Sequence, residues 1–117
     1  EGRTECPCGG KLVDSIVHFG QSLPERDLSL AYEHSQRSDL FLAVGSSLVV
    51  TPAADMPLDA LRSGANLVII NSGETPFDHH CAVRFHERIG DVLPEAVRRL
   101  KAVMGANEYK EGEKTLK

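Results

Sequence analysis

Two short, unbroken apolar runs constrain the fold of this chain more than any other feature of its sequence. One run covers residues 40–44 and ends at Gly45, and the other covers residues 67–70 and ends at Asn71. Continuous apolar runs of about four to eight residues are typical of strands in parallel sheets, where both faces are buried. The segment between the runs is long enough for one helix. The two runs therefore predict a strand, helix, strand unit with both strands buried on both faces.

The other segments predict further elements of the same kind. We expect an extended segment or strand at residues 11–17, helices at 25–37 and 55–62, a third strand at 82–86, and a last helix capped by Asp91. Apolar residues recur at helical spacing after Asp91, which is the strongest periodic signal in the chain. Strands that alternate with helices predict a right-handed parallel α/β sheet with helices on both faces.

Composition bounds the class of protein. The chain has 117 residues, of which 41% are hydrophobic and 26% charged, as expected for one globular domain. A formal charge of −4 argues against nucleic-acid binding by this segment, and no apolar run approaches the roughly 18 residues of a membrane span. Three cysteines, two of them crowded together, favour a reducing compartment, so we expect the nucleus or the cytoplasm.

Polar residues follow the two buried runs at the point where ligands bind in parallel α/β sheets. Gly45, Ser46 and Ser47 offer close backbone approach and two hydroxyls, and Asn71 offers an amide. These groups could bind a ribose or a phosphate, but glycine, serine and asparagine are also the ordinary residues of turns. Both interpretations stay open from the residues alone.

Cys6 and Cys8, followed by two glycines, form a plausible half of a tetrahedral zinc site. Zinc normally takes four ligands, so two partners would have to come from upstream sequence, and the alternative is a pair of free thiols. The run His79-His80-Cys81 is interpreted as structural, because adjacent side chains on an extended chain point apart. No catalytic residue can be assigned from spacing.

Three longer blocks are more specific together than any of these features alone. They are residues 8–24, with Ile-Val-His-Phe-Gly; residues 39–53, with Gly-Ser-Ser-Leu; and residues 67–71, followed by Thr75-Pro76 and Asp78. In wording, order and spacing, from about Cys6 to Leu100, the chain resembles the sirtuins, NAD-dependent protein-lysine deacylases. The wording is most similar to the class IV, nuclear-type branch. The resemblance implies an incomplete Rossmann-like sheet with half of a small zinc-binding module at the N-terminus.

The resemblance also implies roles for individual residues. The cofactor-binding residues would be Gly45, Ser46, Ser47, Asn71, Ser72, Arg88 and Ile89. The first three would line the adenosine ribose side of NAD, the next two would hold the ribose, and the last two would flank the adenine. The substrate-binding residues would be Val17, Phe19, Gly20 and Val50. The first three would border the acetyl-lysine tunnel, and extended backbone near Val50 would pair with the substrate peptide.

The implied reaction transfers the acyl group of an acylated lysine to ADP-ribose and releases nicotinamide, with a histone as one candidate substrate. In sirtuins the catalytic histidine, the glycine-rich phosphate loop and the first cysteine pair lie in earlier sequence that this chain does not contain. We therefore expect the chain alone to be inactive. We expect residues 1–10 to be half of the zinc module, residues 11–104 the C-terminal part of the NAD-binding domain, and residues 105–117 a disordered tail.

The sequence departs from the family pattern in places, and other functions compete with the enzyme. The cysteines are spaced Cys-x-Cys where Cys-x-x-Cys is common, Gln21 replaces the usual Glu, and Ser46 replaces the commoner Thr. The first departure bears on whether both cysteines are zinc ligands. One alternative function is a non-catalytic fragment that binds adenine nucleotide or a protein partner. Another is the nucleotide-binding middle domain of thiamine-dependent enzymes, which would need neither the Val-His-Phe-Gly loop nor the cysteine pair.

Overall fold

A computed structural model describes residues 4–105 of the chain. By their internal contacts the residues fall into two compact units, Glu1–Leu30 and Ala31–Lys117. The boundary after Leu30 lies later in the chain than the predicted one after residue 10. The predicted disordered tail at residues 105–117 lies outside the described residues except for Gly105.

Before residue 25, the N-terminal unit consists mostly of turns and irregular backbone. An isolated antiparallel bridge joins Glu5 to Lys11, and the Leu12 N–H donates to the Thr4 carbonyl at 3.0 Å. Residues 12–17 have no regular secondary structure and pair with no strand in the described part of the chain. Of the two states predicted for residues 11–17, the strand is not formed. Apolar residues such as Val13 consequently remain exposed.

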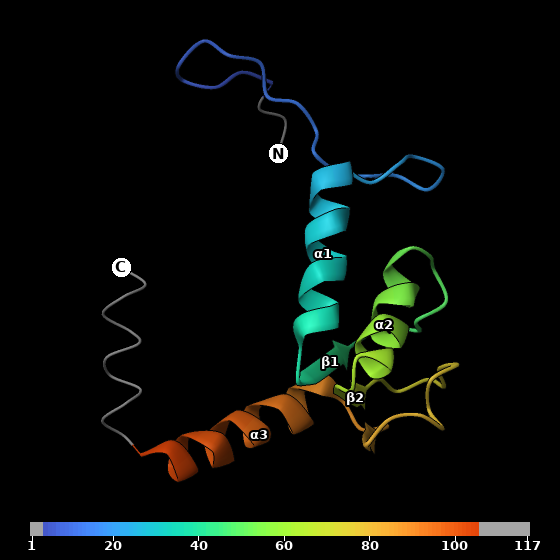
Figure 1. Cartoon of the computed structure of the whole chain (residues 1–117). Helices are drawn as coiled ribbons and strands as arrows, with labels where there is room; N and C mark the ends of the chain where they lie inside the picture. The colour runs from blue at the N-terminus through green and yellow to red at the C-terminus, as the bar shows by residue number, and fades with distance from the viewer. Residues whose placement is uncertain (1–3, 106–117) are drawn as a thin grey trace. The chain divides into compact units, whose positions relative to one another are not determined.

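Helix α1, Glu25–Arg37, has the predicted bounds. Its first turn carries Glu25 and Asp27, which complement the positive end of the helix dipole. In the second unit, Ser35 is buried and its hydroxyl donates to the Ala31 carbonyl at 2.7 Å. The helix is labelled in Figure 1.

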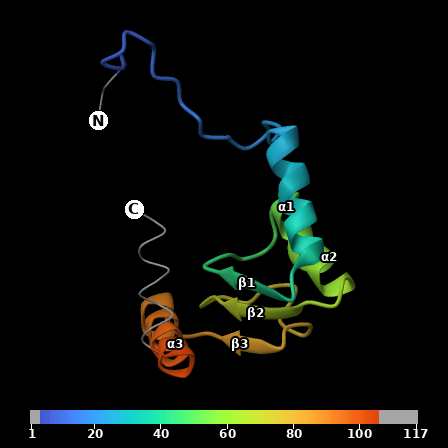
Figure 2. The same ribbon diagram turned by 60° about the vertical axis from the view of Figure 1, so that its left-hand side comes forward.

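The second unit is built on a three-stranded parallel sheet. The strands are β1 (Leu40–Val44), β2 (Asn66–Ile70) and β3 (Val83–Phe85), in the order β1-β2-β3. Leu42 pairs with Val68, and Ile70 pairs with Phe85. Figure 2 shows the three strands running side by side with β2 in the middle. The predicted parallel sheet is confirmed.

One helical crossover joins β1 to β2. A 3₁₀ turn, Ala53–Asp55, leads into α2, Met56–Arg62, one residue later than the predicted start. Pro57 lies in the first turn of α2, where its missing N–H costs no helical hydrogen bond. Gly64 then leaves the helix with φ at +94°. The side chain of Gln36 on α1 donates to Asp59 on α2 at 3.2 Å.

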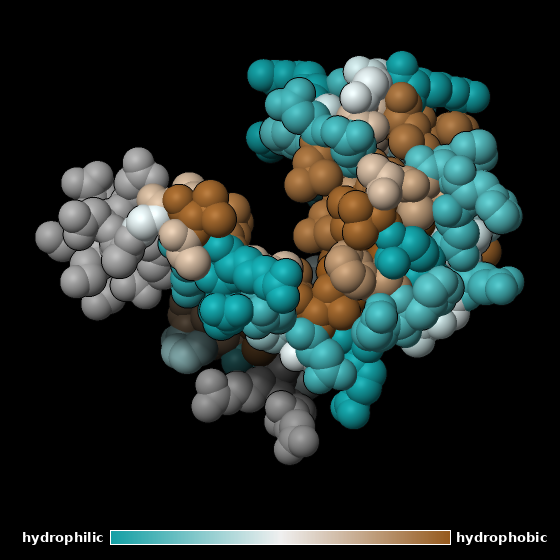
Figure 3. All heavy atoms as spheres, turned by 90° about the horizontal axis from the view of Figure 1, so that it is seen from below, coloured by the Kyte–Doolittle hydropathy of each residue, from teal (hydrophilic) through white to brown (hydrophobic). Residues whose placement is uncertain are grey.

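The core lies on the α2 side of the sheet. It consists of Ala43, Leu48, Leu67 and Ile69, with Phe41, Leu61, Phe77 and Cys81 packed against it. Leu40 and Leu42 lie on the opposite face of β1 and are 58% and 46% exposed. The prediction that β1 is buried on both faces is therefore wrong for the described residues, because α2 covers one face only. Figure 3 shows hydrophobic residues, coloured brown, at the surface of the molecule.

Helix α3, Ile89–Met104, begins two residues before the predicted cap. Arg88, not Asp91, occupies the N-cap position, and its side chain makes no capping hydrogen bond. Asp91 lies in the first turn, where its charge still complements the helix dipole. The apolar repeat is helical as predicted, but no residue of α3 is buried. None of the helices in the described part of the chain is long and apolar enough to cross a membrane.

The one-sided core predicts a large difference between two truncations in neighbouring strands. Ile69→Ala removes a fully buried side chain and should lower the free energy of unfolding by about 2–5 kcal/mol. Leu42→Ala, on the exposed face, should cost less than about 1 kcal/mol. Urea unfolding followed by far-UV circular dichroism measures both. Equal losses would contradict the location of the core.

Candidate functional site

The carboxyl ends of the three strands are held together by backbone hydrogen bonds that continue the ladder by one step. The Gly45 N–H donates to the Ile70 carbonyl at 2.8 Å, and the Asn71 N–H donates to the Phe85 carbonyl at 3.0 Å. Gly45 and Asn71 are therefore fixed beside the last residues of the neighbouring strands. The structure brings these two predicted cofactor residues to the same edge of the sheet.

Gly45 is required both by its conformation and by its neighbour. Its φ of +66° lies in the left-handed region, which favours glycine. A Cβ at this position would meet Cδ1 of Ile89 at 2.9 Å. Gly45 and Ile89 follow β1 and β3, the two edge strands, yet they lie in contact. The predicted ribose side and the predicted adenine side of the site are thus adjacent.

The two serines after Gly45 lie on an exposed turn. The Ser46 hydroxyl accepts a hydrogen bond from the Leu48 N–H at 3.2 Å, and Leu48 is buried with φ at +55°. Ser46 therefore stabilises the turn and can still donate its own hydroxyl hydrogen to a ligand. Ser47 is exposed. The residues of this loop can therefore stabilise a turn and also bind a ligand.

The loop after β2 is fixed by an arginine that sequence reasoning did not single out. The guanidinium of Arg84, on β3, donates to the Asn71 carbonyl at 2.6 Å and to the carbonyls of Phe85 and Gly73. Its Nε donates to Asp78 at 2.8 Å. In the sequence, the sign of this role was an arginine in the middle of an apolar strand. The groups that Arg84 binds could not be predicted from the sequence, because most of them come from other segments.

Asp78, which accepts from Arg84, also accepts two hydrogen bonds from Thr75. The hydroxyl of Thr75 donates to Oδ1 of Asp78 at 2.7 Å, and the Thr75 N–H donates to Oδ2 at 3.0 Å. These two bonds, followed by the bond and the charge of Arg84, lower the pKa of Asp78 to about 2. The carboxylate is therefore ionised at neutral pH. Thr75 and Asp78, quoted above only for their resemblance, thus act on one another directly.

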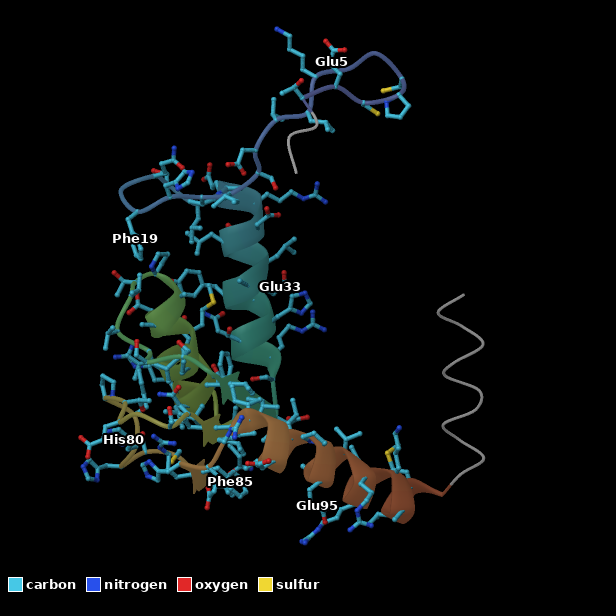
Figure 4. All side chains as sticks on the ribbon, turned by 180° about the vertical axis from the view of Figure 1, so that it is seen from behind. Glu5, Phe19, Glu33, His80, Phe85 and Glu95 are labelled. Carbon is cyan, nitrogen blue, oxygen red and sulfur yellow. The ribbon has the colours of Figure 1, made fainter. Side chains whose placement is uncertain are left out.

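Beside α3 lies a groove that was not predicted. Arg88 and Ile89 are exposed and open the helix. Further along, a groove of about 470 Å³ is lined by Phe85, Val92 and Ala96, with the carboxylates of Asp91 and Glu95 among its other lining groups. Figure 4 labels Phe85 and Glu95, which come from β3 and α3. None of the predicted cofactor residues lines this groove.

The predicted substrate residues are divided between the two units. Val17, Phe19 and Gly20 lie in the N-terminal unit, where Gly20 has φ at +85° and Phe19 is 90% exposed. Figure 4 shows the Phe19 side chain projecting from its turn. Val50 lies in the second unit at a bend, and its carbonyl accepts from the Ala54 N–H at 2.9 Å. The chain therefore bends at Val50. The substrate roles stay predictions.

Cys6 and Cys8 lie in one tight turn. The Cys6 N–H donates to the Gly10 carbonyl at 2.8 Å, and Gly9 adopts a φ of +86°. A hydrogen bond from the Cys6 side chain lowers the pKa of the Cys8 thiol. Two thiols on one turn fit two positions of a tetrahedral zinc site. Residues 4–105 contain no group of three or more His, Cys, Asp or Glu that could hold a metal, so the turn can supply at most part of one.

The cluster His79-His80-Cys81 belongs to the loop between β2 and β3. Both histidines are exposed, and the Cys81 thiol donates to the Asp78 carbonyl at 3.2 Å. Figure 4 labels His80 on this loop. The packing of Cys81 against the core agrees with its structural interpretation.

Comparison with known proteins finds similarity to one family. A family model described as "Sir2 family" matches residues 2–52. NAD-dependent protein deacetylase 1 of Geobacillus kaustophilus is 48% identical over 103 residues, which are 87% of this chain and 43% of that protein. Over most of its length, this chain is therefore similar to part of a sirtuin. NAD-dependent protein deacetylase 1 of Pyrobaculum aerophilum is 38% identical over 104 residues, 88% of this chain and 41% of that protein.

Solved sirtuin structures share the fold. A structure described as "Sir2-p53 peptide-NAD+" matches with a TM-score of 0.68 and 40% identity, covering 86% of this chain and 41% of that one. Another, "Sir2 bound to acetylated peptide", matches with the same TM-score, identity and coverage. The chain therefore spans less than half the length of the sirtuins it matches. The relatives named here are bacterial and archaeal and give no support to the predicted class IV, nuclear-type branch.

The contact between Gly45 and Ile89 predicts a specific effect of adding one methyl group. Gly45→Ala should cost about 1–2 kcal/mol of stability, because alanine is strained at positive φ. Gly64→Ala, where a Cβ has open space at φ +94°, should cost a similar amount. Only Gly45→Ala should shift the NMR signal of the Ile89 δ1 methyl. A similar methyl shift in both variants would contradict the contact.

The low pKa of Asp78 predicts a pH dependence with a definite sign. An aspartate in an unfolded chain titrates at about pH 3.9. Because the folded pKa is about 2, ionised Asp78 stabilises the fold above about pH 5, and this contribution is lost as the pH falls toward 2. The ¹³C shift of the Asp78 carboxyl measures the titration directly. Thr75→Val should raise this pKa, since it removes the largest cause of the shift, and an unchanged pKa would contradict the assignment.

Proposed function

We propose that this chain is part of an NAD-dependent protein-lysine deacylase. The observation that carries the proposal is 48% identity with an NAD-dependent protein deacetylase over nearly the whole chain. The likeness in fold to sirtuins described with NAD and with acetylated peptide supports it. The enzyme would transfer the acyl group of an acylated lysine to ADP-ribose and release nicotinamide.

The strand-end loops would bind the cofactor. When bound, NAD supplies the ribose carbon that receives the acyl oxygen and the bond to nicotinamide that breaks. Gly45 allows the backbone to approach the adenosine ribose, and the exposed hydroxyls of Ser46 and Ser47 can hydrogen-bond it. Asn71 and Ser72 would hold the ribose from the next strand. Ile89 would cover one side of the adenine from its position against Gly45, and Arg88 would lie next to it in the chain.

The substrate would be an acylated lysine on a protein. Val17, Phe19 and Gly20 would border the tunnel that receives its side chain. An apolar tunnel accepts a neutral acyl-lysine and penalises a charged lysine through desolvation. The backbone near Val50 would contact the peptide main chain. A histone is one candidate substrate. No residue of this chain is proposed as the general base, since sirtuins carry that histidine in earlier sequence.

Zinc would be bound by Cys6 and Cys8 with two ligands from upstream sequence. The shared turn of the two thiols supports this assignment. The zinc would be structural, because two protein thiolates from each half would fill a tetrahedral site and leave no open position. Three further proposals rest on sequence reasoning alone. They are the nuclear-type branch, a nuclear or cytoplasmic location, and the lack of direct binding to nucleic acid or membrane.

The proposal predicts a difference between this chain and one extended upstream to the length of its relatives. The extended protein should contain about one zinc per chain and deacetylate an acetyl-lysine peptide only with NAD. The 117-residue chain should do neither. Zinc is measured by mass spectrometry and nicotinamide release by chromatography. Cys8→Ser should lower the zinc content of the extended protein, while Cys81→Ser serves as a matched control and should not.

The outcomes separate the enzyme from its alternative. Activity and zinc in the extended protein alone would support a deacylase. Inactivity of both proteins, with ADP-ribose still bound, would favour a non-catalytic fragment that binds adenine nucleotide. Normal zinc content in Cys8→Ser would overturn the ligand assignment while leaving the deacylase proposal intact.

A further inference from the structure

In the loop that follows β2, Asn71 is anchored by three hydrogen bonds. The Asn71 N–H donates to the Phe85 carbonyl, the Asn71 carbonyl accepts from Arg84, and the Asn71 side-chain Nδ2 donates to the Gly73 carbonyl at 3.1 Å. These bonds leave Oδ1 of Asn71 available to a ligand. The loop therefore presents this acceptor in a fixed orientation.

Arg84 is the centre of this anchoring. The Gly73 carbonyl accepts from both Arg84 and the side chain of Asn71, so the arginine is coupled to the Asn71 amide through one shared oxygen. The carbonyls that Arg84 binds also lie on both sides of Ser72, which is exposed. A guanidinium with donors in a rigid plane suits this arrangement better than a point charge such as lysine.

The burial of the pair argues against an ordinary surface ion pair. The side chains of Arg84 and Asp78 are 12% and 19% exposed, whereas Arg98 on α3, which pairs with Glu95, is 68% exposed. Largely buried charges are costly unless they are paired and hydrogen-bonded. Here each charge is satisfied: Arg84 by three carbonyls and Asp78, and Asp78 by Thr75 and Arg84. The network therefore ties the loop after β2 to β3 through fully paired charges.

We propose that Arg84, anchored by Asp78, is a positioning residue that orients Asn71 and Ser72 toward the cofactor ribose. This inference rests on the proposed function for the ligand it names. Arg84 itself would not touch the cofactor, because four of its five N–H donors already bind Asp78 and the carbonyls of Asn71, Gly73 and Phe85. It would act by reducing the conformational freedom that NAD binding must otherwise remove.

The kinetic test uses the extended protein, in which the reaction can be followed. Arg84→Met should raise the KM for NAD about tenfold and change kcat at saturating NAD less than about twofold, because a positioning residue affects ground-state and transition-state binding alike. Arg84→Lys should recover part of the loss. Arg98→Met, which removes the exposed pair on α3, is the matched control and should leave both constants unchanged. A lower kcat with unchanged KM in Arg84→Met would indicate only a loss of folded enzyme and would overturn the proposal.

A second measurement uses the 117-residue chain without any nucleotide. Amide hydrogen exchange at Asn71–Gly73 should be about tenfold faster in Arg84→Met than in wild type or Arg98→Met, whereas exchange in α2 should not change. Unchanged exchange in the loop would overturn the positioning role. If exchange changes as expected but the extended wild-type protein neither binds ADP-ribose nor turns over, the proposed function fails and Arg84 only stabilises the fold.

Discussion

The parallel pairing of β1, β2 and β3 is the constraint on which the rest of the second unit depends. Its register sets Leu67 and Ile69 against Phe41 and Ala43 on the face that α2 covers, so the core follows from the pairing. The same ladder continues one step beyond the strands and holds the loops that begin at Gly45 and Asn71. Core and candidate site are therefore consequences of one set of backbone hydrogen bonds.

Much of this fold could be predicted because the signals are local. Residues 40–44 and 67–70 are apolar without interruption, and residues 25–37 follow Pro24 with acidic residues in the first turn, so strands and helix were found within a residue. The start of α3 was missed because Asp91 is a good cap residue, yet the backbone becomes helical at Ile89. The exposure of Leu40 and Leu42 could not be predicted, since an apolar run does not state which of its faces another segment covers.

The residues of the candidate site were predicted from the sequence, but the contacts between them were not. Glycine, serine and asparagine after buried strands indicated where a ligand would bind, and the resemblance to sirtuins indicated which one. The contact of Gly45 with Ile89 and the anchoring of Asn71 by Arg84 depend on residues brought together only by the fold. Asp78 illustrates the difference, because its role depends on Thr75 within the same loop and on Arg84 from another strand.

The central claim is that the strand-end loops of this chain form one wall of an adenine nucleotide site. The most direct test is an NMR titration of the ¹⁵N-labelled 117-residue chain with ADP-ribose. The account predicts that shifts concentrate at Gly45, Ser46, Asn71, Ser72 and Ile89. Shifts confined to the groove lined by Phe85, Val92 and Ala96, or no shifts at millimolar ADP-ribose, would contradict it.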